Sequence, residues 1–120
     1  ASVLSQEIAI KIMAKSSRGK VLSRSSKMLK ENLQLFQSWL DNHAGLFTFV
    51  PPRAGGMAFV GYKMDINSME LAHKLRTEQS VLIVPGDCYG MDGYLRFGIG
   101  SEATYLSAGL DRVSEGIKSL

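Results

Sequence analysis

Apolar residues recur at helical spacing in the first third of the chain. They predict a helix over residues 3–15, with a stripe made of Leu4, Ile8, Ile12 and Met13. Weak helix formers and Gly19 follow, so we expect this helix to end there. A second, longer helix is predicted over residues 20–42, because one face carries Leu22, Leu29, Leu33, Phe36 and Leu40.

Beyond residue 45 the period shortens to the two-residue alternation of strands. Residues 46–50 (LFTFV) and residues 57–62 (MAFVGY) are each predicted to form a strand. Pro51 and Pro52 end the first of them, because proline cannot donate a hydrogen bond to a neighbouring strand. The two strands are therefore separate elements joined by a short connection.

The next segment combines a helix with an apolar run. Asn67 and Glu70 match the spacing of a capping box, which predicts a helix over residues 68–77. The run VLIV, residues 81–84, is apolar at every position, as in a central strand that is buried on both faces. We therefore expect residues 81–84 to form an interior strand of the sheet, followed by a loop over residues 87–93.

The last predicted strand, residues 94–99, places a cation among apolar neighbours. Leu95, Phe97 and Ile99 form one apolar face, whereas Arg96 points to the opposite face. On pattern alone, simple solvent exposure explains an arginine on the polar face of a strand. The alternative is a binding role, because a guanidinium can grip a carboxylate with two parallel hydrogen bonds.

A terminal helix is predicted from about residue 101, where apolar residues recur every three or four positions as far as Leu120. The order of elements predicts an α+β fold with a small, mostly antiparallel sheet of about four strands. We expect helices packed on one face of this sheet and two helices preceding it. The boundary between these two parts is placed at residues 43 and 44.

Composition and charge narrow the class of protein. The chain has 120 residues, 45% of them hydrophobic and 21% charged, which is typical of one globular domain. A single cysteine, Cys88, excludes an intrachain disulfide and favours a reducing compartment. No stretch matches a signal peptide or a membrane span, so we expect a cytoplasmic protein without a membrane partner.

The net charge of +3 is unevenly distributed. Half of the lysines and arginines lie within residues 11–30, without any acidic residue: Lys11, Lys15, Arg18, Lys20, Arg24, Lys27 and Lys30. Two interpretations stay open, namely the solvated face of a helix and a module that binds nucleic acid or a partner. The first is favoured, because no aromatic residue is interleaved to stack on bases.

Several kinds of site are not indicated by the sequence. His43 and His73 are isolated, without cysteines or carboxylates at metal-ligand spacing, so no metal site is predicted. No Ser-His-Asp arrangement and no Walker-type phosphate loop occurs. Cys88 has no histidine near it in sequence that would activate a thiolate. We therefore assign no catalytic residue within the chain.

The segment around Arg96 carries a resemblance to a known family. Pro85-Gly86 follows an apolar run, and Leu95-Arg96 lies on the last strand, with Tyr89-Gly90 between them. This order resembles the C-terminal signature of the class I and II aminotransferases, which are fold-type I enzymes that use pyridoxal phosphate. The family usually has Phe-Gly at the position of Tyr89-Gly90, which is a conservative difference.

Other segments extend this resemblance over nearly the whole chain. Residues 52–59 resemble the Pro-x-x-Gly-x-x-Phe segment of the family, residues 30–40 its long interdomain helix, and residues 1–10 the start of the preceding helix. The resemblance thus implies a helical lead-in with an interdomain helix over residues 1–43. Residues 44–120 would then form the small α+β domain of an aminotransferase.

The resemblance implies roles for individual residues. Arg96 falls on the arginine that binds the α-carboxylate of the substrate, and Tyr89 falls on the aromatic residue that forms a wall of its pocket. Five further residues would shape the cleft, namely Pro85, Gly86, Gly90, Gly55 and Gly56. For three charged residues we expect only exposed positions in loops, namely Arg53, Lys63 and Asp92.

The resemblance also implies pyridoxal 5'-phosphate as the cofactor and amino acids and 2-oxo acids as substrates of a homodimeric enzyme. In the family, a lysine in a Ser-x-x-Lys segment forms a Schiff base with the cofactor. No lysine of this chain lies in such a context. We therefore expect the PLP-binding large domain to be absent from the chain, and the chain alone to be inactive. No nucleic-acid partner is expected on this interpretation.

Overall fold

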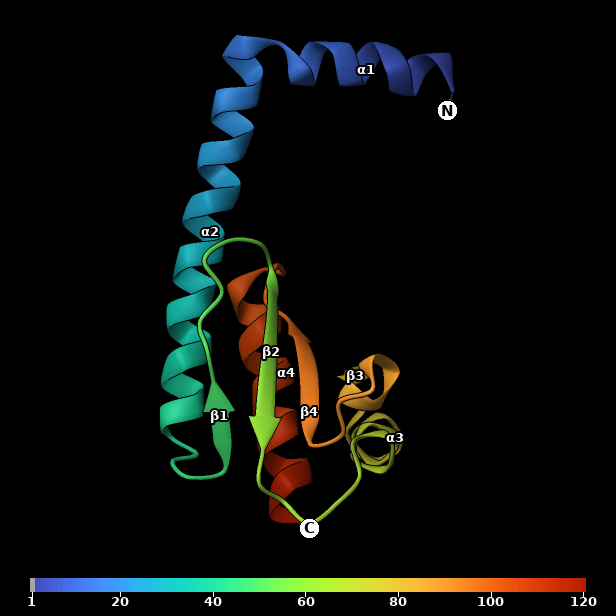
Figure 1. Cartoon of the computed structure of the whole chain (residues 1–120). Helices are drawn as coiled ribbons and strands as arrows, with labels where there is room; N and C mark the ends of the chain where they lie inside the picture. Colours follow the sequence, from blue (N-terminus) through green and yellow to red (C-terminus); the bar gives the residue numbers. More distant parts are fainter. Residues whose placement is uncertain (1) are drawn as a thin grey trace.

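A helical arm and a sheet backed by helices make up the chain, and the computed structural model describes residues 2–120 (Figure 1). The elements, in chain order, are α1 (Val3–Met13), α2 (Lys15–Asp41), β1 (Phe47–Phe49), β2 (Met57–Tyr62), α3 (Ser68–Gln79), β3 (Val84–Pro85), the 3-10 helix η1 (Gly86–Tyr89), β4 (Tyr94–Gly98) and α4 (Ala103–Lys118). The arm consists of α1 and the first half of α2, which project from the rest of the molecule.

The four strands form one sheet in the order β1-β2-β4-β3, and all neighbouring strands are antiparallel. In this register Arg96 of β4 lies between Phe59 of β2 and Val84 of β3. The predicted α+β class is therefore confirmed, as is the four-stranded antiparallel sheet. Strand β4, which carries the arginine, is an interior strand.

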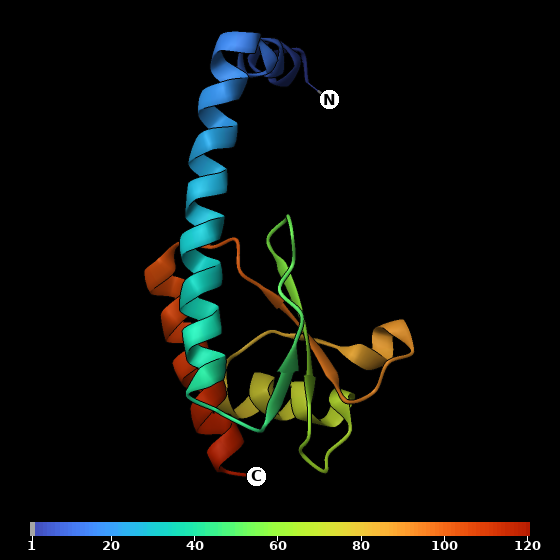
Figure 2. The ribbon, with the colours of Figure 1, turned by 60° about the vertical axis from the view of Figure 1, so that its left-hand side comes forward.

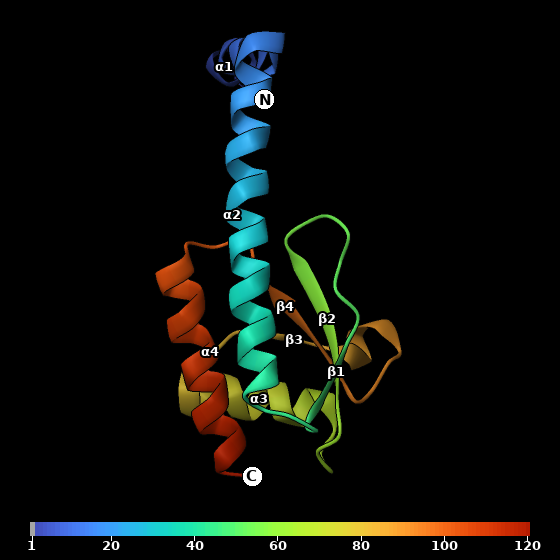
Figure 3. The same cartoon turned by 90° about the vertical axis from the view of Figure 1, so that its left-hand side faces the viewer.

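Helices α2, α3 and α4 lie on one side of the sheet, as the turned views show (Figures 2 and 3). The core between them includes Leu95 and Phe97 of β4, which are 0% and 6% exposed. Phe36 of α2 is fully buried, and its ring centroid lies 5.0 Å from that of Phe97 and 5.5 Å from that of Phe49. The predicted alternation along β4 is confirmed, because its apolar residues are the ones that face the helices.

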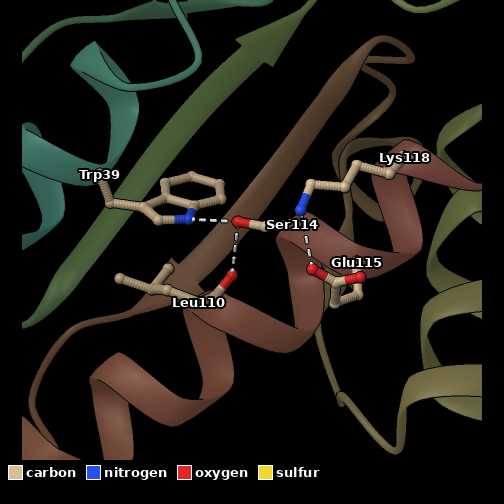
Figure 4. Close-up of polar contacts among 5 residues, drawn as sticks. All are labelled: Trp39, Leu110, Ser114, Glu115 and Lys118. Atoms are coloured by element: carbon tan, nitrogen blue, oxygen red, sulfur yellow. Dashed lines mark hydrogen bonds and ion pairs between the residues drawn. The ribbon is translucent and has the colours of Figure 1, made fainter.

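Polar contacts join α2 to α4 beside this aromatic core (Figure 4). The indole nitrogen of Trp39 donates a hydrogen bond of 2.8 Å to the hydroxyl of Ser114, which in turn donates to the carbonyl oxygen of Leu110 at 3.1 Å. Trp39 thus buries its ring while its N–H has a partner. One turn further on, Lys118 and Glu115 form an exposed ion pair of 2.8 Å.

The predicted break around Gly19 is wrong. Helix α2 begins at Lys15 and continues through Gly19, and the helical path is interrupted only at Ala14, whose φ of −55° and ψ of 140° are extended. A glycine costs a helix only about 1 kcal/mol relative to alanine. The 27-residue helix therefore continues through this weak position, because propagation adds one hydrogen bond for each residue fixed.

The interior strand predicted at residues 81–84 is also wrong. Only Val84 and Pro85 pair with β4, and this short strand β3 forms an edge of the sheet. The amide of Val81 donates to the carbonyl of Leu75 and so completes the end of α3 rather than a strand. Leu82 is 87% exposed, which contradicts burial on both faces.

Helix α1 has no buried residue, although it is rich in apolar side chains. Val3 and Leu4 are 76% and 70% exposed, and Ile10 is 66% exposed. Among residues 2–120, no helix combines the length and the apolar character needed to cross a bilayer. The apolar surface of α1 is therefore a feature that the fold of this chain does not cover.

We expect the Phe36→Ala variant to lose about 3–5 kcal/mol of unfolding free energy, because it leaves a cavity where α2 meets the sheet. Val50→Ala is the matched control, since Val50 is 85% exposed and its truncation should change stability by less than about 0.5 kcal/mol. Urea unfolding followed by circular dichroism measures both variants. Equal losses in the two variants would contradict the assignment of the core.

Candidate functional site

The face of the sheet that points away from the helices carries Arg96 at its centre. By the alternation of the strands and their register, this outer face consists of Thr48, Met57, Phe59, Gly61, Val84, Tyr94, Arg96 and Gly98. Arg96 is half-buried, and it is the one charged side chain among these eight residues. The face therefore combines one cation with mainly aromatic and small residues.

The guanidinium group of Arg96 has no hydrogen bond or ion pair with any of residues 2–120. Its Cζ atom lies 5.5 Å from the centre of the Tyr89 ring, which is cation–π geometry. This contact restrains the side chain without using its N–H groups. Five N–H donors are thus available for an anion that approaches the open face.

Three aromatic rings lie on the same side of the sheet as this cation, and one of them, Tyr89, contacts it. Phe59, directly opposite Arg96, stacks on Tyr94 with centroids 5.0 Å apart and meets Tyr89 edge-on at 5.9 Å. Beside them is an open hollow of about 490 Å³, lined by Thr48, Phe49, Val50, Pro52, Met57, Phe59 and Tyr94. The rings replace water around part of the guanidinium, which strengthens its attraction for an anion.

The turn after β3 brings Tyr89 to this face. A Cβ atom on Gly86 would collide with the carbonyl oxygen of Met91 and lie 2.8 Å from Cβ of Tyr94, so only glycine fits there. Gly90 ends η1 with φ of +67°, a left-handed conformation that favours glycine. The structure thus brings Pro85, Gly86 and Tyr89 next to the strand that carries Arg96.

The remaining two predicted residues lie elsewhere. Gly55 and Gly56 precede β2 at the opposite end of the sheet from η1, where the carbonyl of Gly56 accepts a hydrogen bond from the amide of Ile99 at 2.8 Å. Gly56 packs beside Gly100 and Leu29, whereas Gly55 has no neighbour within 4 Å of a Cβ position. Gly56 therefore belongs to a close backbone contact at the end of β4, and neither glycine belongs to the surroundings of Tyr89.

The loop that carries Tyr89 is fixed to the start of α3 by a polar network that sequence reasoning missed. Asp92 accepts hydrogen bonds from the amides of Ser68 and Gly93, both at 2.7 Å. The amide of Asp87 donates to the hydroxyl of Ser68 at 3.0 Å, and the Asn67 side chain donates to the Asp87 carboxylate at 2.7 Å. Arg53, Lys63 and Asp92 are exposed as expected, but Asp92 also has this structural role.

The sequence indicates one part of this network, namely the capped start of the helix at Asn67. Asn67 caps α3 as predicted, since its side-chain oxygen accepts from the amide of Met69 at 2.9 Å. The other amides of the first turn still need acceptors. The amide of Ser68 finds its acceptor 24 residues away in Asp92, a distance over which local pattern gives no information.

One ionisable group of the network, Asp92, and one beside it, Tyr62, have shifted pKa values. Hydrogen bonds from the amides of Ser68 and Gly93 lower the pKa of Asp92, because they favour the ionised carboxylate. Burial, with smaller effects from the Asp92 and Asp87 charges, raises the pKa of Tyr62 to about 12. The neutral phenol of Tyr62 donates a 2.8 Å hydrogen bond to the carbonyl of Ile66.

The basic stretch lies far from this face. Its seven cations are all exposed, and they follow the arm formed by the end of α1 and the first part of α2. Lys27 has a 3.9 Å contact with Glu31. Both interpretations of the basic stretch stay predictions.

Within residues 2–120 no cluster of three or more histidine, cysteine or acidic side chains could hold a metal ion.

This chain was compared with protein-family models, curated proteins and solved structures. The family model "Aminotransferase class I and II" matches residues 1–113. A search among curated proteins finds no match. Among solved structures, a PLP-dependent aminotransferase from Streptococcus suis is 27% identical to this chain, covers 99% of it and superposes with a TM-score of 0.91.

Two further solved structures share the fold at lower identity. An aromatic aminotransferase from Pyrococcus horikoshii is 22% identical over 88% of the chain, with a TM-score of 0.77. The PLP-dependent cyclase OrfR is 21% identical over 99% of the chain, with a TM-score of 0.85. The chain spans 31%, 28% and 32% of the Streptococcus, Pyrococcus and OrfR structures, respectively.

We expect the Gly86→Ala variant to lose about 3 kcal/mol or more, because a methyl group cannot avoid the backbone oxygen of Met91. Gly109→Ala is the matched control, since no atom lies within 4 Å of its Cβ position and alanine favours the α4 helix by up to about 1 kcal/mol. Thermal unfolding separates the two cases. A Gly86→Ala variant as stable as wild type would contradict the turn geometry.

We expect Asp92 to stabilise the fold only while its carboxylate is ionised. Folding lowers the pKa of Asp92 below its value in the unfolded chain, which is near 3.9. The carboxylate therefore contributes its full stabilising free energy above the unfolded pKa, and this free energy is lost as the pH falls through the lowered pKa of the folded state. The unfolding free energy of wild type should therefore exceed that of Asp92→Ala at about pH 6 and approach it at about pH 2. A difference that stays constant over this range would contradict the role given to the carboxylate.

Proposed function

The chain belongs to the class I and II aminotransferase family, and we propose that it acts as the small domain of a PLP-dependent aminotransferase. In this proposal Arg96 binds the α-carboxylate of the amino acid and 2-oxo acid substrates. Tyr89 forms one wall of the substrate pocket, and Pro85, Gly86 and Gly90 hold the turn that carries it. The cytoplasmic location and the homodimer predicted from the sequence belong to the same proposal.

One observation carries this proposal, namely that Arg96 is half-buried on an open face without an anionic partner among residues 2–120. A guanidinium in such a position has lost part of its hydration and gained no ion pair in return. A carboxylate that approaches the face would supply the missing partner through two parallel hydrogen bonds. The cation–π contact with Tyr89 restrains Arg96 before the anion arrives and so lowers the entropy lost on binding.

The residues around Arg96 do not fit pyridoxal phosphate itself. The cofactor needs a lysine amine for its Schiff base and donors for its phosphate, whereas the outer face offers aromatic, apolar and small residues. Lys74 donates to the carbonyl of Ser119, and Lys118 pairs with Glu115, both away from this face. We therefore propose that residues outside these 120 hold the cofactor, and that the chain alone does not catalyse transamination.

The uncovered apolar surface of α1 fits this arrangement. The Streptococcus suis structure matches 99% of the chain, and the chain accounts for 31% of that structure. A helix with no buried residue is stable in a protein when another part packs on its apolar side. We propose that the cofactor-binding domain covers α1, and that the substrate is enclosed between that domain and the face that carries Arg96.

Titration of the ¹⁵N-labelled chain with pyruvate tests the role of Arg96. We expect the Nε–H resonance of Arg96 to shift in a saturable manner, because pyruvate presents a carboxylate beside a 2-oxo group. Pyruvamide, which is uncharged, should leave the resonance unchanged. Arg96→Lys, followed at the backbone amide of residue 96 because lysine has no Nε–H, should weaken the binding about tenfold, since it loses one of the two parallel hydrogen bonds.

Arg53→Lys is the matched control, because Arg53 is an exposed loop arginine. It should leave pyruvate binding unchanged. The proposed role of Arg96 would be wrong if pyruvate shifted the Arg53 and Arg96 resonances equally. It would also be wrong if Arg96→Lys bound pyruvate as tightly as wild type does.

A further inference from the structure

Asn32 is a buried polar residue that the proposed function does not use. Its side chain is 1% exposed, and its amide nitrogen donates two hydrogen bonds, to the carbonyl oxygen of Ile99 at 2.8 Å and to that of Ser101 at 2.7 Å. These partners lie 67 and 69 residues away along the chain. Both N–H groups of the amide are therefore used to hold the backbone that follows β4.

The same backbone is held from its other side by β2. The amide of Ile99 donates to the carbonyl of Gly56, and Gly56 packs against Gly100 and Leu29. Leu29 precedes Asn32 by one helical turn, so α2 touches this junction through two successive turns. The segment from Ile99 to Ser101 thus lies between α2 and the start of β2.

Asn32 also marks the point at which α2 enters the folded part of the molecule. The buried residues of α2 are Asn32, Phe36, Trp39 and Leu40, so no residue of this helix before Asn32 is buried. The first half of α2 and the whole of α1 form the projecting arm. Counted from the arm, Asn32 is therefore the first buried residue of α2, and it follows the half-buried Leu29 that packs beside Gly56.

We propose that Asn32 is a positioning residue that fixes the direction of the arm relative to the strand that carries Arg96. Arg96 precedes Ile99 by three residues, which corresponds to about 10 Å along the strand. A change at the Asn32 contacts would therefore alter the angle between α2 and β4 while leaving the contacts of Arg96 with Tyr89 and Phe59 in place. The consequence for an enzyme rests on the proposed function, because there the arm leads to the cofactor-binding domain.

The chemistry of the side chain explains why asparagine is required. The carbonyl oxygens of Ile99 and Ser101 need donors, and an amide supplies two from one atom. Leucine has a similar size but no donor, so the buried carbonyl of Ile99 and the partly buried carbonyl of Ser101 would lose this partner. Aspartate has the same shape, but its ionised form would repel both oxygens, and only its protonated form can donate one hydrogen bond.

Pulsed EPR on the 120-residue chain tests the proposal through spin labels on the arm and on the folded part. Lys20→Cys and Glu78→Cys provide exposed label sites on α2 and α3, in a Cys88→Ser background. We expect one narrow distance distribution with Asn32 present, and a distribution about twice as broad for Asn32→Leu. Asn32→Asp should be broad at about pH 8 and narrower at about pH 5, as the buried carboxyl takes up a proton and donates again.

Val113→Ala separates positioning from a general loss of stability. Val113 is a core residue of α4 that is 2% exposed, and its truncation destabilises the fold without touching the Asn32 contacts. It should leave the distance distribution narrow. The proposal is wrong if Val113→Ala broadens the distribution as much as Asn32→Leu does, or if folded Asn32→Leu keeps the narrow distribution.

This design distinguishes a failure of the proposal for Asn32 from a failure of the proposed function of Arg96. If Asn32→Leu does not fold, the pH dependence of Asn32→Asp decides the question, and a width that is independent of pH contradicts the proposal. The EPR distances do not depend on substrate binding. Failure of Arg96 to bind pyruvate would thus overturn the proposed function while leaving the positioning role of Asn32 to its own measurement.

Discussion

Strand β4 packs against the helices with one face and carries Arg96 on the other. The rest of the structure depends on the burial of its apolar face. Its apolar residues, Leu95 and Phe97, are buried under the helices, so the strand cannot shift by one residue without turning them outward. The same burial fixes Arg96 on the opposite face, between Phe59 and Val84. The energy that holds the arginine in position therefore comes from hydrophobic packing on the far side of the sheet.

The surroundings of Arg96 depend on contacts that hold neighbouring segments to this strand. The turn at Gly86 and the hydrogen bonds of Asp92 and Asp87 with the start of α3 hold Tyr89 against the guanidinium. At the other end of β4, Asn32 and Gly56 hold the backbone beyond Ile99. Because both ends are held, the residues of the open face are in place before a ligand arrives, which is the property a binding site for a small anion needs.

Local pattern was sufficient for the elements with strong periodicity. The two-residue alternation around Arg96 predicted the strand and both of its faces, and the helical stripe at Phe36 predicted the buried side of α2. It failed for residues 81–84, because an apolar run does not reveal whether its amides pair with a strand or end a helix. It also failed at Gly19, where a weak helix former lies inside a continuous helix.

The site could be predicted only in part for the same reason. The signature around Pro85, Tyr89 and Arg96 is local, so the sequence indicated those residues together. The contacts of Asp92 and Asn32 join residues 24 to 69 positions apart, and such pairs leave no periodic signal in one sequence. Likewise, the apolar stripe of α1 predicted a helix correctly, but the pattern does not tell what packs against it.

The central claim is that Arg96 presents an unpaired guanidinium to a carboxylate on the open face of the sheet. A crystal structure of the chain grown with a 2-oxo acid tests it most directly. The account predicts both carboxylate oxygens at about 2.7–2.9 Å from two nitrogens of Arg96, with the Tyr89 ring still over the guanidinium. A carboxylate bound instead to the lysines of the arm, with no anion at Arg96, would contradict it.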